Sequence, residues 1–157
     1  MTIKMYFADL DDVSIHTLSC ASHQLLFDIS KTRKISSVIM DKFKEYTKAE
    51  KWDEVATAMN KARNFFKHAD RDTDQTLTFN PQQTDIWIWD SCLMYLQLSG
   101  EMTDYIHCYH TWFMLHHRDT IKNDAIRLAL EDASSLLKRP KQEFLEIALI
   151  ALQQRIK

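Results

Sequence analysis

The sequence predicts an all-α protein, an up-and-down bundle of about six helices in a single domain that covers residues 1–157. Three observations lead to this prediction. One glycine and two prolines are too few for a β-rich fold with many tight turns. Apolar residues recur at helical spacing over most of the chain. A length of 157 residues suits one core of ordinary size.

The first long helix is expected to begin near Asp11 or Asp12, after a short helical stub at residues 3–8, because acidic residues favour a helix N-terminus. It runs to about Lys31. An aliphatic stripe repeats along it at 100° per residue, the pattern of a helix face that packs against a core: Ile15, Leu18, Ser22, Leu25, Leu26 and Ile29.

The middle of the chain predicts two further helical segments before an irregular stretch. Residues 36–48 are a weaker segment with Ser36 or Ser37 as the N-cap, and a clear helix runs from Lys51 to His68. Residues 70–80 then interrupt the helical pattern, and "TLTF" alternates like a short extended piece.

Four helices are expected in the remainder. Pro81, with Asn80 as cap, begins a helix rich in large apolar residues that reaches about Ser99 and is expected to be largely buried. Gly100, the only glycine, fits the position that ends it. The last three helices are expected at residues 102–118, 120–138 and 141–156, where Asp119 or Thr120 begins the second and Pro140 precedes the third.

Composition indicates a cytoplasmic protein that does not enter a membrane. Cys20, Cys92 and Cys108 are far apart and odd in number, so free thiols in a reducing compartment are expected. The start of the chain lacks a secretory signal, and no apolar run is long enough to span a bilayer. A formal charge of −2 argues against a strongly basic nucleic-acid scaffold.

The stretch "RNFFKHAD", residues 63–70, surrounds two phenylalanines with polar groups. Arg63 lies eleven residues after Trp52 and therefore close to the apolar face of its helix. Arg63 and His68 are five residues apart, about 140° around a helix. One interpretation is a buried arginine bonded to a neighbouring helix end, with His68 near the negative end of the helix dipole. The other is a functional site.

This stretch resembles the signature of the HEPN superfamily (higher eukaryotes and prokaryotes nucleotide-binding domains), in an uncharacterised bacterial subfamily. Arg63, Asn64 and His68 match the motif, and "DDVSIHTLSCASHQLLFDISK" looks like the family's opening helix. The resemblance covers about the first 100 residues. It implies an all-helical HEPN-like fold and a metal-independent endoribonuclease, or an RNA- or nucleotide-binding effector of the toxin or stress type.

Roles for individual residues follow from the same resemblance. His68 would act as general acid or base, Arg63 would hold the phosphate, and Asn64 would orient one of them, with a 2′,3′-cyclic phosphate as product. Active members work as homodimers without a metal or other cofactor. An antitoxin-type protein partner, such as a nucleotidyltransferase, is also implied.

Lys67 and Arg71 are further candidates for substrate binding, because with Lys61 and Arg63 they form a local positive cluster. Three acids interrupt it: Asp70, Asp72 and Asp74. They lack the residue order of a calcium loop and are expected to solvate the chain there.

A polar stripe on the first long helix admits three interpretations; it comprises Asp12, His16, Cys20, His23 and Phe27. The histidines and the cysteine could ligate a transition metal if another helix gave a fourth ligand. They could be hydrogen-bonded packing residues. Alternatively, His16 and His23 could line the substrate cleft with Arg63 and His68.

The stretch "DYIHCYHTWFMLHH" places His107, His110, Met114 and His117 on one helix face. A metal site or a packing face would explain it, but the Glu-x-x-His pattern of helical metal sites is absent. Aromatic residues concentrate in this region and in the helix before it: Trp87, Trp89, Tyr105, Tyr109, Trp112 and Phe113. They predict a core with a dimer seam, or a base-stacking platform. The alternative function is thus a non-enzymatic interaction module that homodimerises through these aromatic-rich helices.

Overall fold

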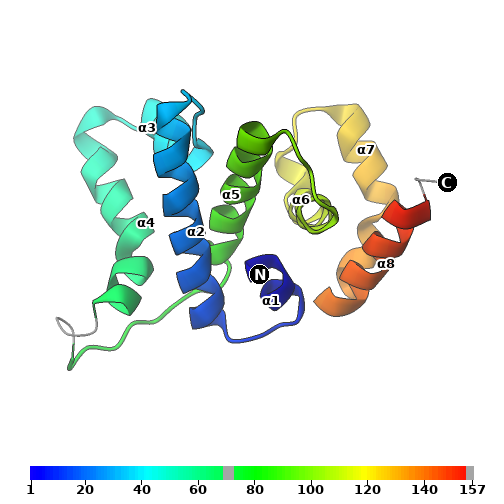
Figure 1. Ribbon diagram of the computed structural model, residues 1–157, viewed down its shortest axis with the longest axis horizontal. Helices are drawn as coiled ribbons and strands as arrows, with labels where there is room; N and C mark the ends of the chain where they lie inside the picture. Colours follow the sequence, from blue (N-terminus) through cyan, green and yellow to red (C-terminus); the bar gives the residue numbers. More distant parts are fainter. Residues whose placement is uncertain (69–72, 155–157) are drawn as a thin grey trace. The chain divides into compact units, whose positions relative to one another are not determined.

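The computed structural model describes residues 1–68 and 73–154, and these residues contain eight α-helices and no strand (Figure 1). The predicted all-α class is therefore confirmed, while residues 75–80, expected to include an extended piece, have no regular structure. Within the described residues, no helix has both the length and the apolar character needed to cross a bilayer.

The α-helices are α1 (Thr2–Phe7), α2 (Asp12–Thr32), α3 (Phe43–Tyr46), α4 (Trp52–Lys67), α5 (Gln83–Ser99), α6 (Asp104–His116), α7 (Asp124–Asp132) and α8 (Lys141–Gln154). A π-helical turn covers Val38–Lys42, and 3₁₀ turns cover Ala49–Lys51, Arg118–Thr120 and Ser134–Lys138. The count exceeds the expected six because it includes two short helices, α1 with six residues and α3 with four.

Three of the predicted helix ends are confirmed by their caps. Asp11 caps α2 by accepting a hydrogen bond from the Ser14 backbone N–H at 2.7 Å, and Ser37 caps the π-helical turn in the same way. Gly100 ends α5 in the left-handed region with φ of 72°. The predicted start at Asp119 or Thr120 is wrong, because α7 begins at Asp124 after the capping side chain of Asn123.

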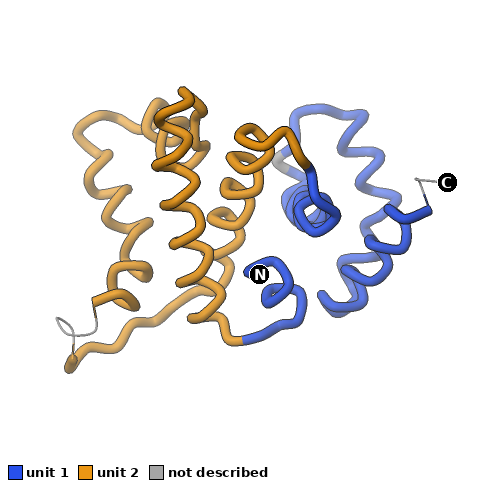
Figure 2. Tube along the Cα trace, in the orientation of Figure 1, with its two compact units in different colours: residues 1–10, 102–157 blue, residues 11–101 orange. Residues whose placement is uncertain are grey.

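The chain divides into two compact units (Figure 2). Unit 2 is the continuous segment Asp11–Glu101, and unit 1 combines Met1–Leu10 with Met102–Lys157. The single domain stays a prediction from the sequence, and each unit has buried residues of its own.

Unit 2 is a bundle in which α2 packs against both α4 and α5 (Figure 1). Its core contains Cys20, Ile39 and Trp87, and three partly buried side chains pack against them: Met40, Met59 and Ile86. Burial of these groups is the main source of stability for such a bundle.

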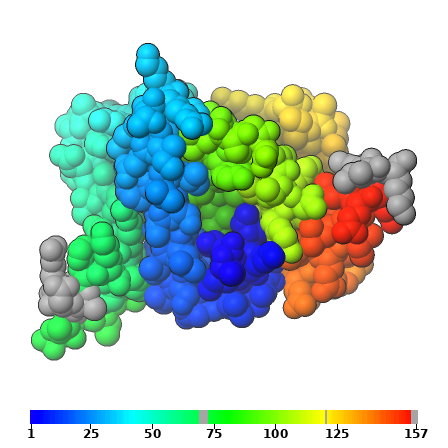
Figure 3. Space-filling view, in the orientation of Figure 1, coloured from blue at the N-terminus to red at the C-terminus, as the bar shows by residue number. Residues whose placement is uncertain are grey.

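The face of α2 that packs inward is the polar stripe, not the aliphatic one. His16, Cys20 and His23 are at most 2% exposed, whereas Leu18, Leu25 and Ile29 are 41%, 63% and 40% exposed. In the space-filling view α2 forms a column of surface side chains (Figure 3). The expectation that the aliphatic stripe packs against the core is therefore wrong for most of its residues. The reason is that α5 supplies bulky residues to the interface, and α2 contributes small and polar side chains that bond to α5.

Unit 1 is built on aromatic packing among α1, α6 and α8. Phe7 stacks on Phe144 with ring centroids 5.9 Å apart, and the indole N–H of Trp112 donates to the Tyr6 hydroxyl at 3.1 Å. Tyr109 is fully buried beside them. Aromatic packing in α6 therefore forms a core inside one chain, and the dimer seam expected there stays a prediction.

Candidate functional site

Arg63 lies on the side of α4 that faces α2, one turn before the helix ends. It is half-buried, and its guanidinium donates to Gln24 Oε1 on α2 at 2.9 Å and to Asn60 Oδ1 on its own helix at 3.3 Å. A guanidinium has five N–H donors. Three of them have no partner among the described residues, so this arginine is held in place and can still bind an anion.

Gln24 connects Arg63 to an acid. Its amide nitrogen donates to Asp28 Oδ2 at 2.9 Å, while its oxygen accepts from Arg63. The Gln24 hydrogen bond, together with the nearby charges of Lys31 and Arg63, holds the pKa of the Asp28 carboxyl below its usual range. A ligand phosphate at Arg63 would thus lie near one fixed negative charge.

His68 follows the last residue of α4, and its backbone N–H bonds to the Asn64 carbonyl at 3.0 Å. Its imidazole is half-buried and has no hydrogen-bond partner in the described part of the chain. Asn64 and Lys67 are exposed. Arg71, with Asp70 and Asp72, lies outside the described residues.

The structure does not join the three motif side chains to one another. Among the described residues, Arg63 bonds to Gln24 and Asn60, and neither Asn64 nor His68 contributes a side-chain hydrogen bond to it. His68 sits at the negative end of α4, as the purely structural interpretation expects, whereas Arg63 bonds to side chains and not to a helix end. Within one chain, therefore, the guanidinium of Arg63 and the imidazole of His68 are not hydrogen-bonded to each other.

His16 is fully buried between α2 and α5. Its Nδ1 lies 3.0 Å from the Thr84 hydroxyl and its Nε2 lies 3.4 Å from Cys20 Sγ, while Phe79 packs on the ring at 4.9 Å. Burial lowers the pKa of His16, which favours the neutral imidazole. The prediction that His16 binds substrate has no support in this geometry.

His23 belongs to a second buried polar cluster centred on Asp90 of α5. The carboxylate accepts from His23 Nε2 at 2.8 Å, from the Ser37 hydroxyl at 2.5 Å and from the Val38 backbone N–H at 2.8 Å. Burial alone would raise the pKa of Asp90, but these hydrogen bonds from His23, Ser37 and Val38 outweigh it and keep the pKa below its usual value. The cluster ties α2 and the π-helical turn to α5, and it leaves His23 closed off from any cleft.

The described residues contain no group of three or more His, Cys, Asp or Glu side chains placed to hold a metal ion. His16 and Cys20 contact each other, but His23 is bonded to Asp90. On α6, His107 lies 3.5 Å from the Thr111 hydroxyl, and burial, followed by the charge of His107, lowers the pKa of His110. The histidines of α2 thus act here as packing residues with polar partners, and on α6 His107 has a polar neighbour.

Four residues important to these arrangements were not singled out by the sequence: Gln24, Asn60, Thr84 and Asp90. Asn60 precedes Arg63 by three residues, a spacing that places both on one helix face and could have indicated the pair. Asp90 is an acid inside an otherwise apolar stretch, which is also a usable signal. Gln24 and Thr84 contact residues far away in the chain, and no local pattern indicates them.

Comparison of the chain with protein-family models, with curated proteins and with solved structures gives no match in any of the three. The functional argument therefore depends on the geometry described above.

Proposed function

We propose that the α2–α4 surface around Arg63 binds a phosphate of RNA or of a nucleotide, and that the chain acts as a HEPN-type RNA- or nucleotide-directed protein. The observation that carries this proposal is the fixed guanidinium of Arg63, which Gln24 and Asn60 hold half-buried and whose other three N–H donors bond to no described residue. A pre-positioned guanidinium binds phosphate well because little side-chain entropy remains to be lost.

Two neighbouring groups support the proposal. Lys67 is exposed one turn after Arg63 and adds a positive charge on the same side of α4. The imidazole of His68 has no hydrogen-bond partner among the described residues, and imidazoles are common general acids and bases. In a ribonuclease His68 would assist attack of the 2′-hydroxyl on phosphorus or protonate the departing 5′-oxygen, leaving a 2′,3′-cyclic phosphate.

Cleavage would require two chains, because Arg63 and His68 do not converge within one. A homodimer that brings the two motifs to one cleft would supply the missing partner groups, as expected of an effector of the toxin type. His16 and His23 have no part in this proposal, since both are buried and bonded inside unit 2.

The test is cleavage of a short fluorescent RNA by the purified protein in EDTA. Wild type should cleave it, and His68→Ala and Arg63→Ala should each lose roughly 100-fold or more in rate, the usual contribution of an acid–base or charge-stabilising group. Arg127→Ala, which removes an exposed arginine from α7 of unit 1, is the matched control and should retain full activity. Circular dichroism verifies that each variant is folded.

Two results would contradict the proposal. Wild-type protein that neither cleaves RNA nor binds a nucleotide in calorimetry would remove it altogether. Activity that survives both substitutions would show that another site or a contaminant is responsible.

A second candidate function is a non-enzymatic interaction module, and one observation favours it. Leu18, Leu25 and Ile29 project from one face of α2 at intervals of seven and four residues, and all are exposed. Helices that pair with another helix commonly have this spacing. Sedimentation should then show a homodimer for wild type and a monomer for Leu25→Glu, while Leu128→Glu, at a 60% exposed leucine of α7, should leave the dimer unchanged.

A further inference from the structure

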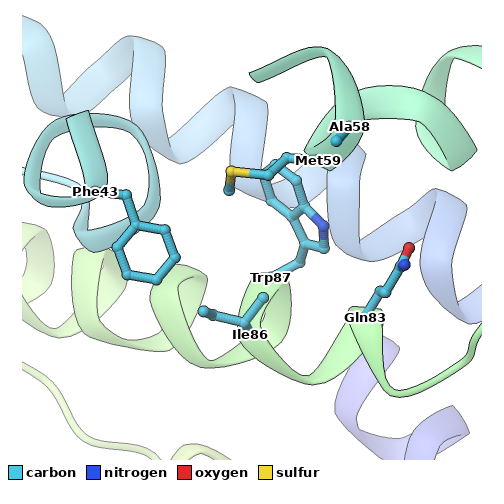
Figure 4. A pocket seen from close by; sticks show the side chains of 6 residues that line it. All are labelled: Phe43, Ala58, Met59, Gln83, Ile86 and Trp87. Carbon is cyan, nitrogen blue, oxygen red and sulfur yellow. The ribbon is translucent and has the colours of Figure 1, made fainter. Parts of the chain in front are cut away.

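A hollow of about 280 Å³ lies in unit 2 between α3, α4 and α5 (Figure 4). Six residues line it: Phe43 from α3, Ala58 and Met59 from α4, and Gln83, Ile86 and Trp87 from α5. Phe43, Ala58 and Gln83 are exposed at its rim, and Trp87 at its floor is 2% exposed. None of these residues belongs to the motif around Arg63.

The walls of this hollow select against charge. Two aromatic rings, a thioether and an isoleucine side chain form most of the lining, and no ionisable side chain takes part. An ion placed there would lose its hydration without gaining a counter-charge. The matching ligand surface is therefore uncharged and largely apolar.

One polar group at the floor bonds to no other described residue. The indole N–H of Trp87 has no hydrogen-bond partner among the described residues, although the side chain is almost fully buried. The Trp87 side chain is also held by α2, since its ring contacts the His23 ring edge-on with centroids 4.7 Å apart. Figure 4 shows the indole nitrogen on the edge of the ring turned toward Gln83, whose amide lies at the rim. The nitrogen is not one of the fully buried unpartnered atoms among the described residues, so it can be reached from the hollow and can donate to an acceptor on a ligand there.

The volume sets the size of the ligand. A dry apolar cavity of roughly 150 Å³ accommodates benzene, and ligand sites for larger molecules begin at roughly 300 Å³. A volume of about 280 Å³ thus suits a flat molecule of two fused rings. A ring stacked beside Phe43 or Trp87 would also match the flat shape of these walls.

We infer that this hollow is a binding site for a small, uncharged, bicyclic heteroaromatic molecule whose ring acceptor takes a hydrogen bond from the Trp87 indole N–H. The inference is independent of the proposed function, because it uses neither Arg63 nor His68. Each of the two can fail while the other stands.

Quinoline is a suitable probe, since it has two fused rings and an acceptor nitrogen and is uncharged at neutral pH. The chain has four tryptophans, and their indole N–H signals can be followed in a nitrogen–proton correlation spectrum. The Trp87 signal is assigned with Trp87→Phe. Titration with quinoline should shift the Trp87 signal in a saturable way and leave the signals of Trp52, Trp89 and Trp112 nearly unchanged.

Two comparisons separate the parts of the inference. Indole has a similar size but a ring N–H in place of the acceptor, and it should bind roughly two- to tenfold more weakly, the effect of one net hydrogen bond. Ala58→Leu fills the hollow from the exposed surface of α4 and should weaken quinoline binding at least tenfold. Thr57→Leu adds a side chain of the same kind at the neighbouring exposed residue, outside the lining, and should bind as wild type does.

The absence of a saturable Trp87 shift overturns the inference, and so does a shift that persists unchanged in Ala58→Leu. Equal shifts of all four indole signals would show non-specific binding of the probe and would have the same consequence. Indole binding as tight as that of quinoline would remove the hydrogen bond to Trp87 from the inference and with it the ligand class.

Discussion

Replacement of Asp90 by Asn removes the charge at the centre of the buried cluster in unit 2 while keeping the shape of the side chain. Asp90 is fully buried, and its Oδ2 accepts from His23, Ser37 and the Ile39 backbone N–H, whereas its Oδ1 accepts from the Val38 backbone N–H. An asparagine side chain has one oxygen acceptor where the aspartate has two. Its NH₂ group must therefore face at least one of these donors.

The expected loss can be worked out from these bonds. Hydrogen bonds to a charged group contribute roughly 1.5–3 kcal/mol each, and neutral ones about half as much. If the amide oxygen keeps the three bonds of Oδ2 in weakened form and the Val38 bond is lost, the cost is several kcal/mol. Relief from burying a charge offsets part of it, so we expect Asp90→Asn to destabilise unit 2 by about 3 kcal/mol.

Urea unfolding followed by tryptophan fluorescence measures this loss, because Trp52, Trp87 and Trp89 all lie in unit 2. With a denaturant dependence of about 2 kcal/mol per molar, the midpoint should fall by about 1.5 M. Asp28→Asn is the matched control on the exposed side of α2, where its partners are Gln24 and Lys31, and it should cost less than about 1 kcal/mol. Equal midpoints for the two variants would refute the role assigned to the Asp90 cluster.

Three more expectations follow from burial and backbone geometry. Burial raises the pKa of the thiols of Cys20 and Cys92 to about 12 and that of Cys108 to about 11, so a thiol reagent at mildly alkaline pH should modify the native protein slowly and all three cysteines quickly in urea; rapid native modification would contradict this. Burial lowers the pKa of His16 from 6.5, so below this pH the unfolded chain binds a proton that the folded chain does not, and stability should fall as the pH drops. His16→Asn should reduce the slope of the unfolding midpoint against pH in that range. An unchanged slope would show that His16 does not contribute. Gly100→Ala meets no atom within 4 Å but forces an L side chain to φ of 72°, so a loss of about 1 kcal/mol is expected, Gly100→Asn should lose less, and a stabilised alanine variant in the same urea assay would contradict the assignment.

Local signals predicted much of the secondary structure. Asp11, Ser37 and Gly100 mark helix ends through bonds or backbone angles that involve only neighbouring residues, and such signals can be read from sequence. Asn80 shows the limit of this reasoning: its side chain accepts a hydrogen bond from the Gln82 N–H in a turn, and α5 begins only at Gln83. Because Asn80 is engaged in this turn, the helix starts two residues after the expected Pro81.

The orientation of α2 could not be predicted in the same way. Counting apolar residues favoured the face with Leu18 and Leu25, but the choice is made by α5, which offers Thr84 and Asp90 to His16 and His23. These pairs are 68 and 67 residues apart, so no pattern within α2 reveals them. The same limit applies to the motif, since Gln24 meets Arg63 across 39 residues.

Because unit 2 is a continuous segment placed within the sequence of unit 1, the order in which the ribosome makes the chain has a consequence for assembly. Residues 11–101 can collapse soon after they emerge, whereas α1 must wait for α6 and α8, its contacts in unit 1, until synthesis is nearly complete. During that interval the ring partners of Tyr6 and Phe7, which are Tyr109 of α6 and Phe144 of α8, have not all been made, so the apolar face of α1 is completed last.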